Sequence, residues 1–196
     1  MAFDPQRNPW VYFGTGDREY PKDTSNPPER FYAVKEDGSG AYPRTEDDLI
    51  NVTAVNSFNP ETAKKGWYIQ LEKTGKSIEK VLAKPAVFNK LVYFTTYTYT
   101  EMADPCSVAG TAKLYIVEYL SGGGAFEVDD FLDFMGTPSV RSKEIGDGVP
   151  SAPVITANTK GKASVMIGTT SGQIFSKEAF SPSSNKEILY WREVTP

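Results

Sequence analysis

The chain has 196 residues, of which 39% are hydrophobic and 23% are charged, a composition typical of a globular protein with one well-buried domain. Its formal net charge of −4, with lysines and arginines scattered along the chain, excludes the concentrated basic face that nucleic acid requires. The absence of histidine and the presence of one cysteine exclude histidine-dependent catalysis, histidine-ligated metals, an internal disulfide and a cysteine-rich zinc site.

The apolar runs are short, for example Leu91 to Phe94 and Leu114 to Val117, so no membrane span is predicted. The first residues, Met1-Ala2-Phe3-Asp4, have neither the basic start nor the apolar core of a signal peptide. On their own, these features suit a cytoplasmic protein or a part of a longer one.

Aromatic residues make up 13% of the chain and Gly and Pro are frequent, which favours short strands and turns over helices. The first half predicts strands over 9–16 and 30–34, a loop over 18–29, and a short helical turn over 45–50 with Thr45 as its N-cap. The second half predicts a hairpin of 84–88 and 91–96 across Asn89-Lys90, because Asn tolerates positive φ. Further strands are expected over 113–119, 151–155, 164–170 and 173–175, and a strand-and-loop excursion over 120–142.

Three of these units, at 10–16, 84–96 and 152–170, share one pattern, because each contains a hydrophobic strand that ends in Gly or Thr. In the second and third units a first strand precedes it, which begins with Lys-Pro or Ala-Pro. A repeated antiparallel meander with a period of about 40 to 50 residues is typical of β-propeller blades. The sequence therefore predicts an all-β fold of about four blades in a single domain over 1–196. A β-sandwich with similar hairpins is the alternative. Since closed propellers use about four to eight blades, we expect the chain to be the C-terminal portion of a larger, modified propeller that another polypeptide completes.

The chain resembles the end of the C-terminal propeller of the PilY family, the large type IV pilus biogenesis and tip-adhesin proteins. The resemblance covers nearly the whole chain in order, and its matching stretches are 9–19, 30–35, 45–49, 52–53, 65–69, Leu71, 80–85, 92–96, Asp104-Pro105-Cys106, Gly110, Leu114-Tyr115, 151–154 and Gly168-Thr169.

This resemblance implies an exported protein at the pilus tip or bacterial cell surface, which passes through the periplasm in transit. It implies a non-enzymatic scaffold that promotes pilus assembly, opposes retraction and adheres to surfaces or host receptors. The partners implied are minor pilins, the secretion channel, and the upstream part of the same precursor. The family's calcium loop of Asp-x-Asp-x-Asp-Gly type is not found in this chain, so calcium binding is not carried over to any residue.

No catalytic, cofactor-binding or metal residue is assigned from the sequence. Asp129, Asp130 and Asp133 could bind a cation, but their spacing lacks the alternation and glycine of a calcium loop and suits a solvated loop. Cys106 could pair with a cysteine of another chain or remain a buried thiol.

Several other residues are candidates for packing or contact. Tyr93, Tyr97 and Tyr99 are expected to pack between sheets, although one face could offer an adhesive aromatic surface. Trp67 and Trp191 are expected in the core between sheets. The residues Asp17, Arg18 and Glu19 could contact a partner, but are expected to bond one another or nearby loop backbone.

Two competing functions share the propeller fold. A carbohydrate-binding or carbohydrate-active propeller could work without histidine, but the sequence has no repeated Asp-box turn and its arginines are dispersed. A quinoprotein dehydrogenase would need a cofactor face with a calcium site, for which the sequence has no signal. Both alternatives predict a bound small ligand or an activity, and the scaffold interpretation predicts neither.

Overall fold

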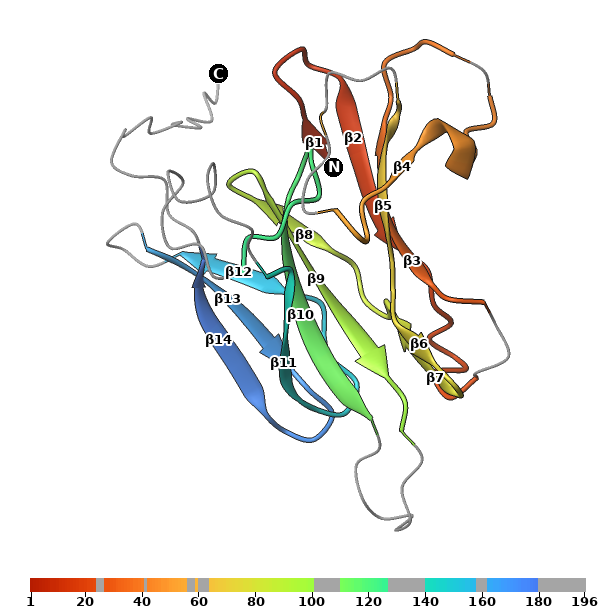
Figure 1. Ribbon diagram of the computed structural model, residues 1–196. Helices are drawn as coiled ribbons and strands as arrows, with labels where there is room; N and C mark the ends of the chain where they lie inside the picture. The colour runs from red at the N-terminus through yellow and green to blue at the C-terminus, as the bar shows by residue number, and fades with distance from the viewer. Residues whose placement is uncertain are drawn as a thin grey trace, which may run out of the picture.

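The computed structural model describes residues 1–23, 27–40, 42–55, 59, 64–100, 110–126, 140–157 and 162–179. Within these ranges the fold is all-β, as predicted, and the single helical element is the 3-10 turn η1 (Glu46–Asp48). Three sheets are stacked face to face, with the first on the right, the second in the middle and the third on the left of Figure 1. No helix in the described ranges is long and apolar enough to cross a membrane.

Sheet 1 is built from the first part of the chain, and its strands contain β-branched and aromatic residues that favour extended backbone. Its strands, in spatial order, are β1 (Ala2–Phe3), β2 (Pro9–Gly14), β3 (Arg30–Lys35), β5 (Gly66–Gln70) and β4 (Ile50–Asn51). All neighbours are antiparallel except β4 and β5, which are parallel. The predicted helical turn is η1, and Thr45 is its N-cap in a capping box with Asp48, as expected.

Sheet 2 lies in the middle of the stack. Its main path is β11 (Ser142–Asp147), β10 (Thr111–Glu118), β9 (Leu91–Thr98), β7 (Ser77–Lys80) and β6 (Lys73–Thr74). Strand β8 (Ala86–Phe88) pairs with the first residues of β9, while β7 pairs with its last residues. The predicted tight reversal between β8 and β9 is confirmed, because Asn89 and Lys90 have φ of 48° and 63°.

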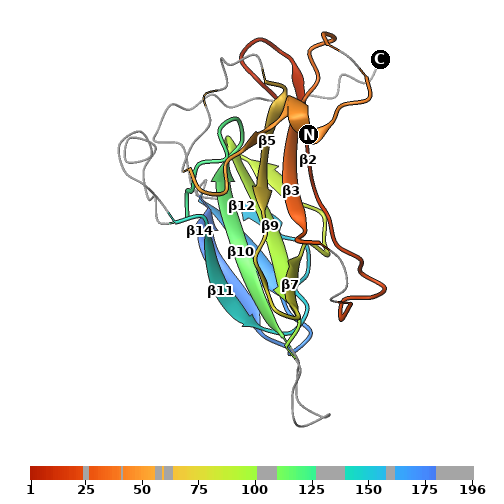
Figure 2. The same cartoon turned by 45° about the vertical axis from the view of Figure 1, so that its right-hand side comes forward.

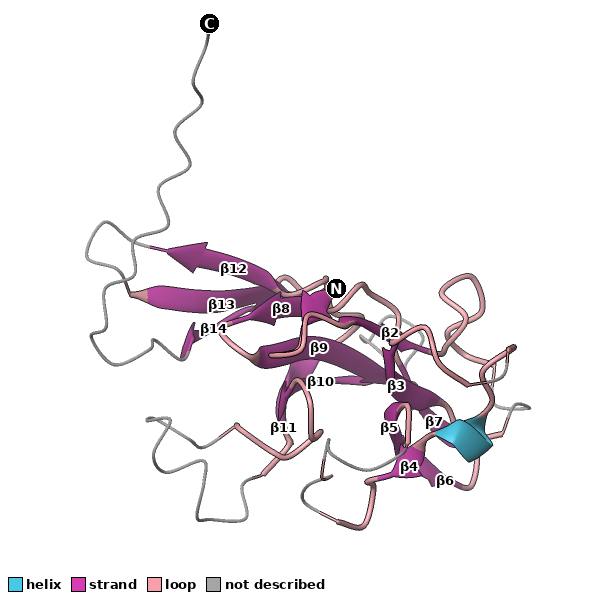
Figure 3. Ribbon diagram, turned by 90° about the horizontal axis from the view of Figure 1, so that it is seen from above, coloured by secondary structure: helices cyan, strands magenta, loops and turns pink. Residues whose placement is uncertain are grey.

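Sheet 3 is an antiparallel meander of β12 (Val154–Ala157), β13 (Ala163–Gly168) and β14 (Ile174–Ala179). Its first strand follows Pro153, as β8 follows Pro85, and the two strands contact each other. Corresponding edge strands of sheets 2 and 3 therefore lie close together, as Figure 3 shows from above.

The hydrophobic core consists of two layers, one on each face of sheet 2. The layer between sheets 1 and 2 contains a ring stack of Phe31, Phe94 and Tyr115, with centroid distances of 3.7 Å and 4.6 Å. The layer between sheets 2 and 3 contains Tyr93, Leu114 and Val165, all fully buried. Sheet 2 is thus covered on both faces: in Figure 1 β9 and β10 lie between β3 and β12, and in Figure 2 the strands of sheet 3 are seen behind β10.

The sheets do not follow the expected spacing of about 40 to 50 residues. They begin at Ala2, Lys73 and Val154, and long connections such as the one between β3 and β4 separate the strands within a sheet. The predicted period was wrong because connections such as that of residues 36–49 lengthen the spacing between strands of one sheet.

Candidate interaction surfaces

The outward face of sheet 1, on the side away from sheet 2, carries a row of three aromatic rings. Phe13, Tyr32 and Tyr68 are cross-strand neighbours on β2, β3 and β5. The rings of Phe13 and Tyr32 stack at 5.2 Å, and those of Tyr32 and Tyr68 are tilted at 5.8 Å. The Arg30 guanidinium lies 5.9 Å from the centre of the Tyr68 ring, a cation–π distance. We call Phe13, Tyr32 and Tyr68 the outer row.

The outer row borders a recess of about 620 Å³ between sheet 1 and the connection that follows β3. The recess is lined on the sheet side by four side chains of β2 and β3 and on the other side by five residues of the connection: Val11, Phe13, Tyr32, Val34, Glu36, Arg44, Thr45, Glu46 and Leu49. Its apolar floor remains accessible, because Val11 is 45% and Phe13 is 43% exposed. Such a contiguous apolar surface with polar groups at its edge is typical of a binding face.

Charged contacts hold the connection against the sheet. Glu46 accepts a hydrogen bond from the Tyr32 hydroxyl and lies 3.1 Å from the Arg30 guanidinium. Burial, followed by the bond to Glu46, raises the pKa of the Tyr32 hydroxyl to about 12. The carboxylate of Asp37 lies 2.8 Å from Lys65 and 3.3 Å from Lys35. The hydrogen bond from Lys65 is the largest effect that lowers the pKa of Asp37, which is well below its usual range.

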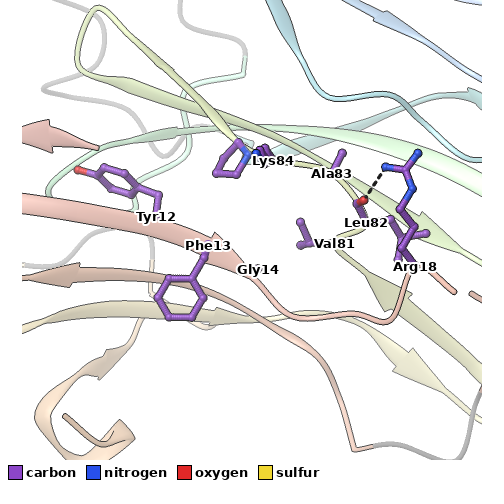
Figure 4. A pocket seen from close by; sticks show the side chains of 9 residues that line it. Tyr12, Phe13, Gly14, Arg18, Val81, Leu82, Ala83 and Lys84 are labelled. Atoms are coloured by element: carbon purple, nitrogen blue, oxygen red, sulfur yellow. Dashed lines mark hydrogen bonds between the residues drawn. The ribbon is translucent and has the colours of Figure 1, made fainter. Parts of the chain in front are cut away.

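A second hollow, which we call the edge groove, runs along the free edge of β2 and has a volume of about 420 Å³. One wall is β2 and the other is the connection between β7 and β8; its lining residues are Tyr12, Phe13, Gly14, Arg18, Val81, Leu82, Ala83, Lys84 and Pro85 (Figure 4). Arg18 donates a hydrogen bond of 3.1 Å to the carbonyl oxygen of Leu82 across one end of the groove. Two exposed cations, Arg18 and Lys84, therefore line an otherwise apolar groove.

Most of the aromatic residues singled out from the sequence are core residues. Trp67 is fully buried between sheets 1 and 2 and Tyr93 between sheets 2 and 3, as predicted. Tyr97 is also buried, while Tyr99 is half-buried and its ring lies 5.5 Å from the Lys22 ammonium group. These tyrosines therefore form no continuous exposed aromatic surface.

The polar residues after β2 behave as expected of a loop. The Asp17 carboxylate accepts hydrogen bonds from the backbone N–H groups of Glu19 and Tyr20. Cys106, Trp191 and the three aspartates Asp129, Asp130 and Asp133 lie outside the described residues. Among the residues that the structure does describe, no group of three or more acidic or cysteine side chains could hold a metal ion.

Two features were missed in the sequence. The outer row was missed because Phe13, Tyr32 and Tyr68 are far apart in the chain; the signal was the unbroken apolar run from Trp10 to Phe13, which fits a strand buried on both faces. The second is Arg141, whose guanidinium donates hydrogen bonds to the carbonyl oxygens of Gly122, Val52, Thr53 and Val55 and so ties sheet 2 to sheet 1. Burial lowers the pKa of Arg141.

Searches of protein-family models, of curated proteins and of solved structures with this chain found no match.

Proposed function

We propose that the chain is a non-enzymatic scaffold and interaction module of a type IV pilus tip complex, with its three sheets as consecutive blades of a β-propeller. In this proposal the protein is exported through the periplasm to the cell surface. It binds minor pilins and supports pilus assembly, control of retraction and adhesion to a surface or host receptor. The upstream part of the same precursor supplies the blades that complete the propeller.

The observation that carries this proposal is the difference in side-chain burial between two strands of similar sequence. Both β2 and β9 contain Val-Tyr-Phe, at 11–13 and 92–94. All three residues of β9 are fully buried, because sheet 2 has a neighbouring sheet on each face. In β2 only Tyr12 is buried, and Val11 and Phe13 are exposed on the outward face. A further blade on this face would give β2 the surroundings that β9 has.

Burial of the outward face would also be energetically favourable. Apolar surface gains about 25 cal/mol for each Å² removed from water, and aromatic pairs add a further contribution. The recess beside the outer row offers room for a side chain of the covering sheet. Glu36 and Glu46 at its edge are about two-fifths exposed and can accept hydrogen bonds from that sheet.

Native mass spectrometry tests the proposal on the tagged protein, isolated under non-reducing conditions from the cells that produce it. We expect a complex that contains the upstream part of the precursor or minor pilins. Phe13→Glu, which places a charge in the outer row, should abolish this complex. Thr74→Glu on the exposed strand β6 of sheet 2, which lies on neither outward face, is the matched control for an added surface charge. A wild-type protein that is isolated only as a lone monomer would contradict the proposal.

Carbohydrate binding is a second candidate, which the outer row and recess favour. Stacked rings beside Arg30, Arg44 and Glu46 combine an apolar platform with donors and acceptors for hydroxyl groups. A glycan array followed by calorimetry separates the two functions. Binding that is lost in Tyr68→Ala would support carbohydrate recognition, whereas a protein that binds no glycan but forms the complex supports the scaffold.

A further inference from the structure

The backbone groups of β2 alternate between its two edges. At the β3 side, the Glu36 N–H donates to the Pro9 carbonyl at 2.9 Å and the Thr15 N–H donates to the Arg30 carbonyl at 2.8 Å. In an antiparallel pair, alternate residues face the same neighbour, so Val11 and Phe13 also bond to β3. The N–H and C=O groups of Tyr12 and Gly14 therefore point to the opposite edge of β2.

Within β2 itself, this opposite edge is paired with another strand only at its beginning. The two-residue strand β1 pairs Ala2 with Trp10 and ends the ladder there. Within the described part of the chain, no backbone or side-chain hydrogen bond is made to the N–H or C=O groups of Tyr12 or Gly14 on this side. The corresponding edge of β9 is different, because β8 pairs with its start and β7 with its end.

The edge groove lies directly beside these unpaired groups. Its volume of about 420 Å³ falls within the range of roughly 300–1,000 Å³ found for ligand clefts. The far end is closed where the Val81 N–H donates to the Thr15 carbonyl at 3.0 Å. Val81, Leu82 and Pro85 give the opposite wall an apolar surface that can contact alternate side chains of an extended chain (Figure 4).

The charged side chains that line the groove are all positive. Its lining residues include the cations Arg18 and Lys84 and no carboxylate. Both cations are exposed. An extended segment in this groove would gain a favourable interaction from an acidic side chain.

We propose that the edge groove binds an extended segment of a partner polypeptide as an additional strand, antiparallel to β2 and collinear with β1. The segment bonds to the free N–H and C=O groups of Tyr12 and Gly14, places apolar side chains against Val81 and Leu82, and presents an acidic side chain to Lys84 and Arg18. This mode of recognition takes its affinity from main-chain hydrogen bonds and its specificity from alternate side chains.

The test uses the purified full chain and the peptide acetyl-Glu-Thr-Val-Thr-Val-amide, with amide hydrogen exchange followed residue by residue by NMR. We expect the peptide to slow exchange of the Tyr12 and Gly14 amides by about tenfold or more at saturation, because these groups gain hydrogen bonds. The Val11 and Phe13 amides already bond to β3 and should not change. Peptide binding that leaves the Tyr12 and Gly14 amides unprotected, or no binding at millimolar peptide, would overturn the proposal.

Charge variants provide the second readout. Lys84→Glu should weaken peptide binding about twofold to fivefold, as expected for a solvent-exposed ion pair, while Lys76→Glu in the β6–β7 turn, which does not line the groove, should leave it unchanged. Equal weakening by both variants would indicate that the peptide is attracted by the net charge of the protein, and would contradict binding in the edge groove.

A tethered competitor completes the design. Three residues, Thr-Val-Thr, added before Met1 would continue β1 along Tyr12, Phe13 and Gly14, because Ala2 pairs with Trp10 in an antiparallel register. We expect this extension to protect the Tyr12 and Gly14 amides and to block the free peptide. Unaltered peptide binding by the extended protein would place the peptide elsewhere. These measurements need no pilus component, so their outcome is separate from that of the pilus tip proposal.

Discussion

Strands β2 and β9 show how similar sequences come to different surroundings. Both have alternate residues directed to opposite faces of a sheet, and both carry apolar side chains on each face. In β9, Phe94 packs against sheet 1 and Tyr93 against sheet 3. In β2, Tyr12 packs against sheet 2, but Phe13 lies on the outward face at 43% exposure.

The difference indicates that the local sequence determines a strand, while the number of neighbouring sheets determines what its side chains contribute to stability. An apolar side chain stabilises the fold only to the extent that folding removes it from water. Residues of the same type on β2 and β9 should therefore respond differently to the same substitution.

The largest effect is expected for Phe94→Ala. Its ring is fully buried and stacks on both Phe31 and Tyr115, so we expect a loss of about 3–5 kcal/mol of unfolding free energy. Phe13→Ala removes the same atoms from the exposed outer row and should cost under about 1 kcal/mol. Urea denaturation of both variants measures the two values. Similar losses would show that the outward face of sheet 1 is already buried in solution.

A second comparison concerns two glycines in turns, Gly122 and Gly75. Both have positive φ, at 68° and 59°. A Cβ added at Gly122 would lie 2.9 Å from the Trp67 ring, whereas at Gly75 it would meet nothing within 4 Å. Gly122→Ala should therefore cost about 1–3 kcal/mol for overpacking in addition to the backbone strain of about 1–2 kcal/mol that both variants share.

Thermal and urea unfolding of Gly122→Ala and Gly75→Ala separate the contact with sheet 1 from the strain. Equal destabilisation of the two variants would mean that the turn after β10 moves away from Trp67 without cost. Arg141 ties the same turn to sheet 1 through Gly122, which is why we expect the turn not to relax freely.

Much of the fold could be predicted from local sequence. The expected strands 30–34 and 91–96 correspond to β3 and β9, the helical turn at 45–50 to η1, and the Asn89-Lys90 reversal to the turn between β8 and β9. These elements carry their own signals, namely apolar runs, a capping residue and a residue that tolerates positive φ.

Other elements depend on contacts that no local pattern contains. Strand β11, Ser-Lys-Glu-Ile-Gly-Asp, is mostly polar and is a strand because β10 pairs with it. The short strand β4 pairs in parallel with β5, which lies after a long connection. The outer row and the edge groove likewise arise from the register between separate strands, so neither could be assigned as a site from the sequence.

A smaller effect is expected from pH, through Asp37 in the connection beside the outer row. Its pKa is lowered in the folded protein, chiefly by the hydrogen bond from Lys65, so the unfolded chain binds a proton more readily. The stabilisation is therefore fully present above the unfolded pKa of about 3.9 and is lost as pH falls below it toward the folded pKa.

Denaturation of wild type and Asp37→Asn at pH 7 and pH 3 tests whether the stabilisation by Asp37 decreases as the pH falls. We expect Asp37→Asn to be less stable than wild type at pH 7, by under about 1 kcal/mol for a pair near the surface, and the difference to shrink at pH 3. Lys65→Met is the matched variant, and its stability difference should show the same pH dependence. A difference that grows at pH 3 would contradict the role of the Asp37 carboxylate.

The smallest effects on stability are expected on the two outward faces, which differ in what they expose. On sheet 3, the exposed Met166 has Val154 on one side and Ser176 on the other, and Ser164 lies opposite Glu178. On sheet 1, Val11 and Phe13 continue into Tyr32 and Val34 without a polar interruption. Phe13→Ser and Met166→Ser should each change the unfolding free energy by about 0.5 kcal/mol or less. Binding of a dye that reports apolar surface should nevertheless fall more in Phe13→Ser than in Met166→Ser, because Phe13 belongs to a group of four adjacent apolar side chains, whereas Met166 has only Val154 as an apolar cross-strand partner. An equal fall in both variants would show that the two outward faces expose apolar surface alike, and would remove the argument that sheet 1 in particular requires a covering sheet.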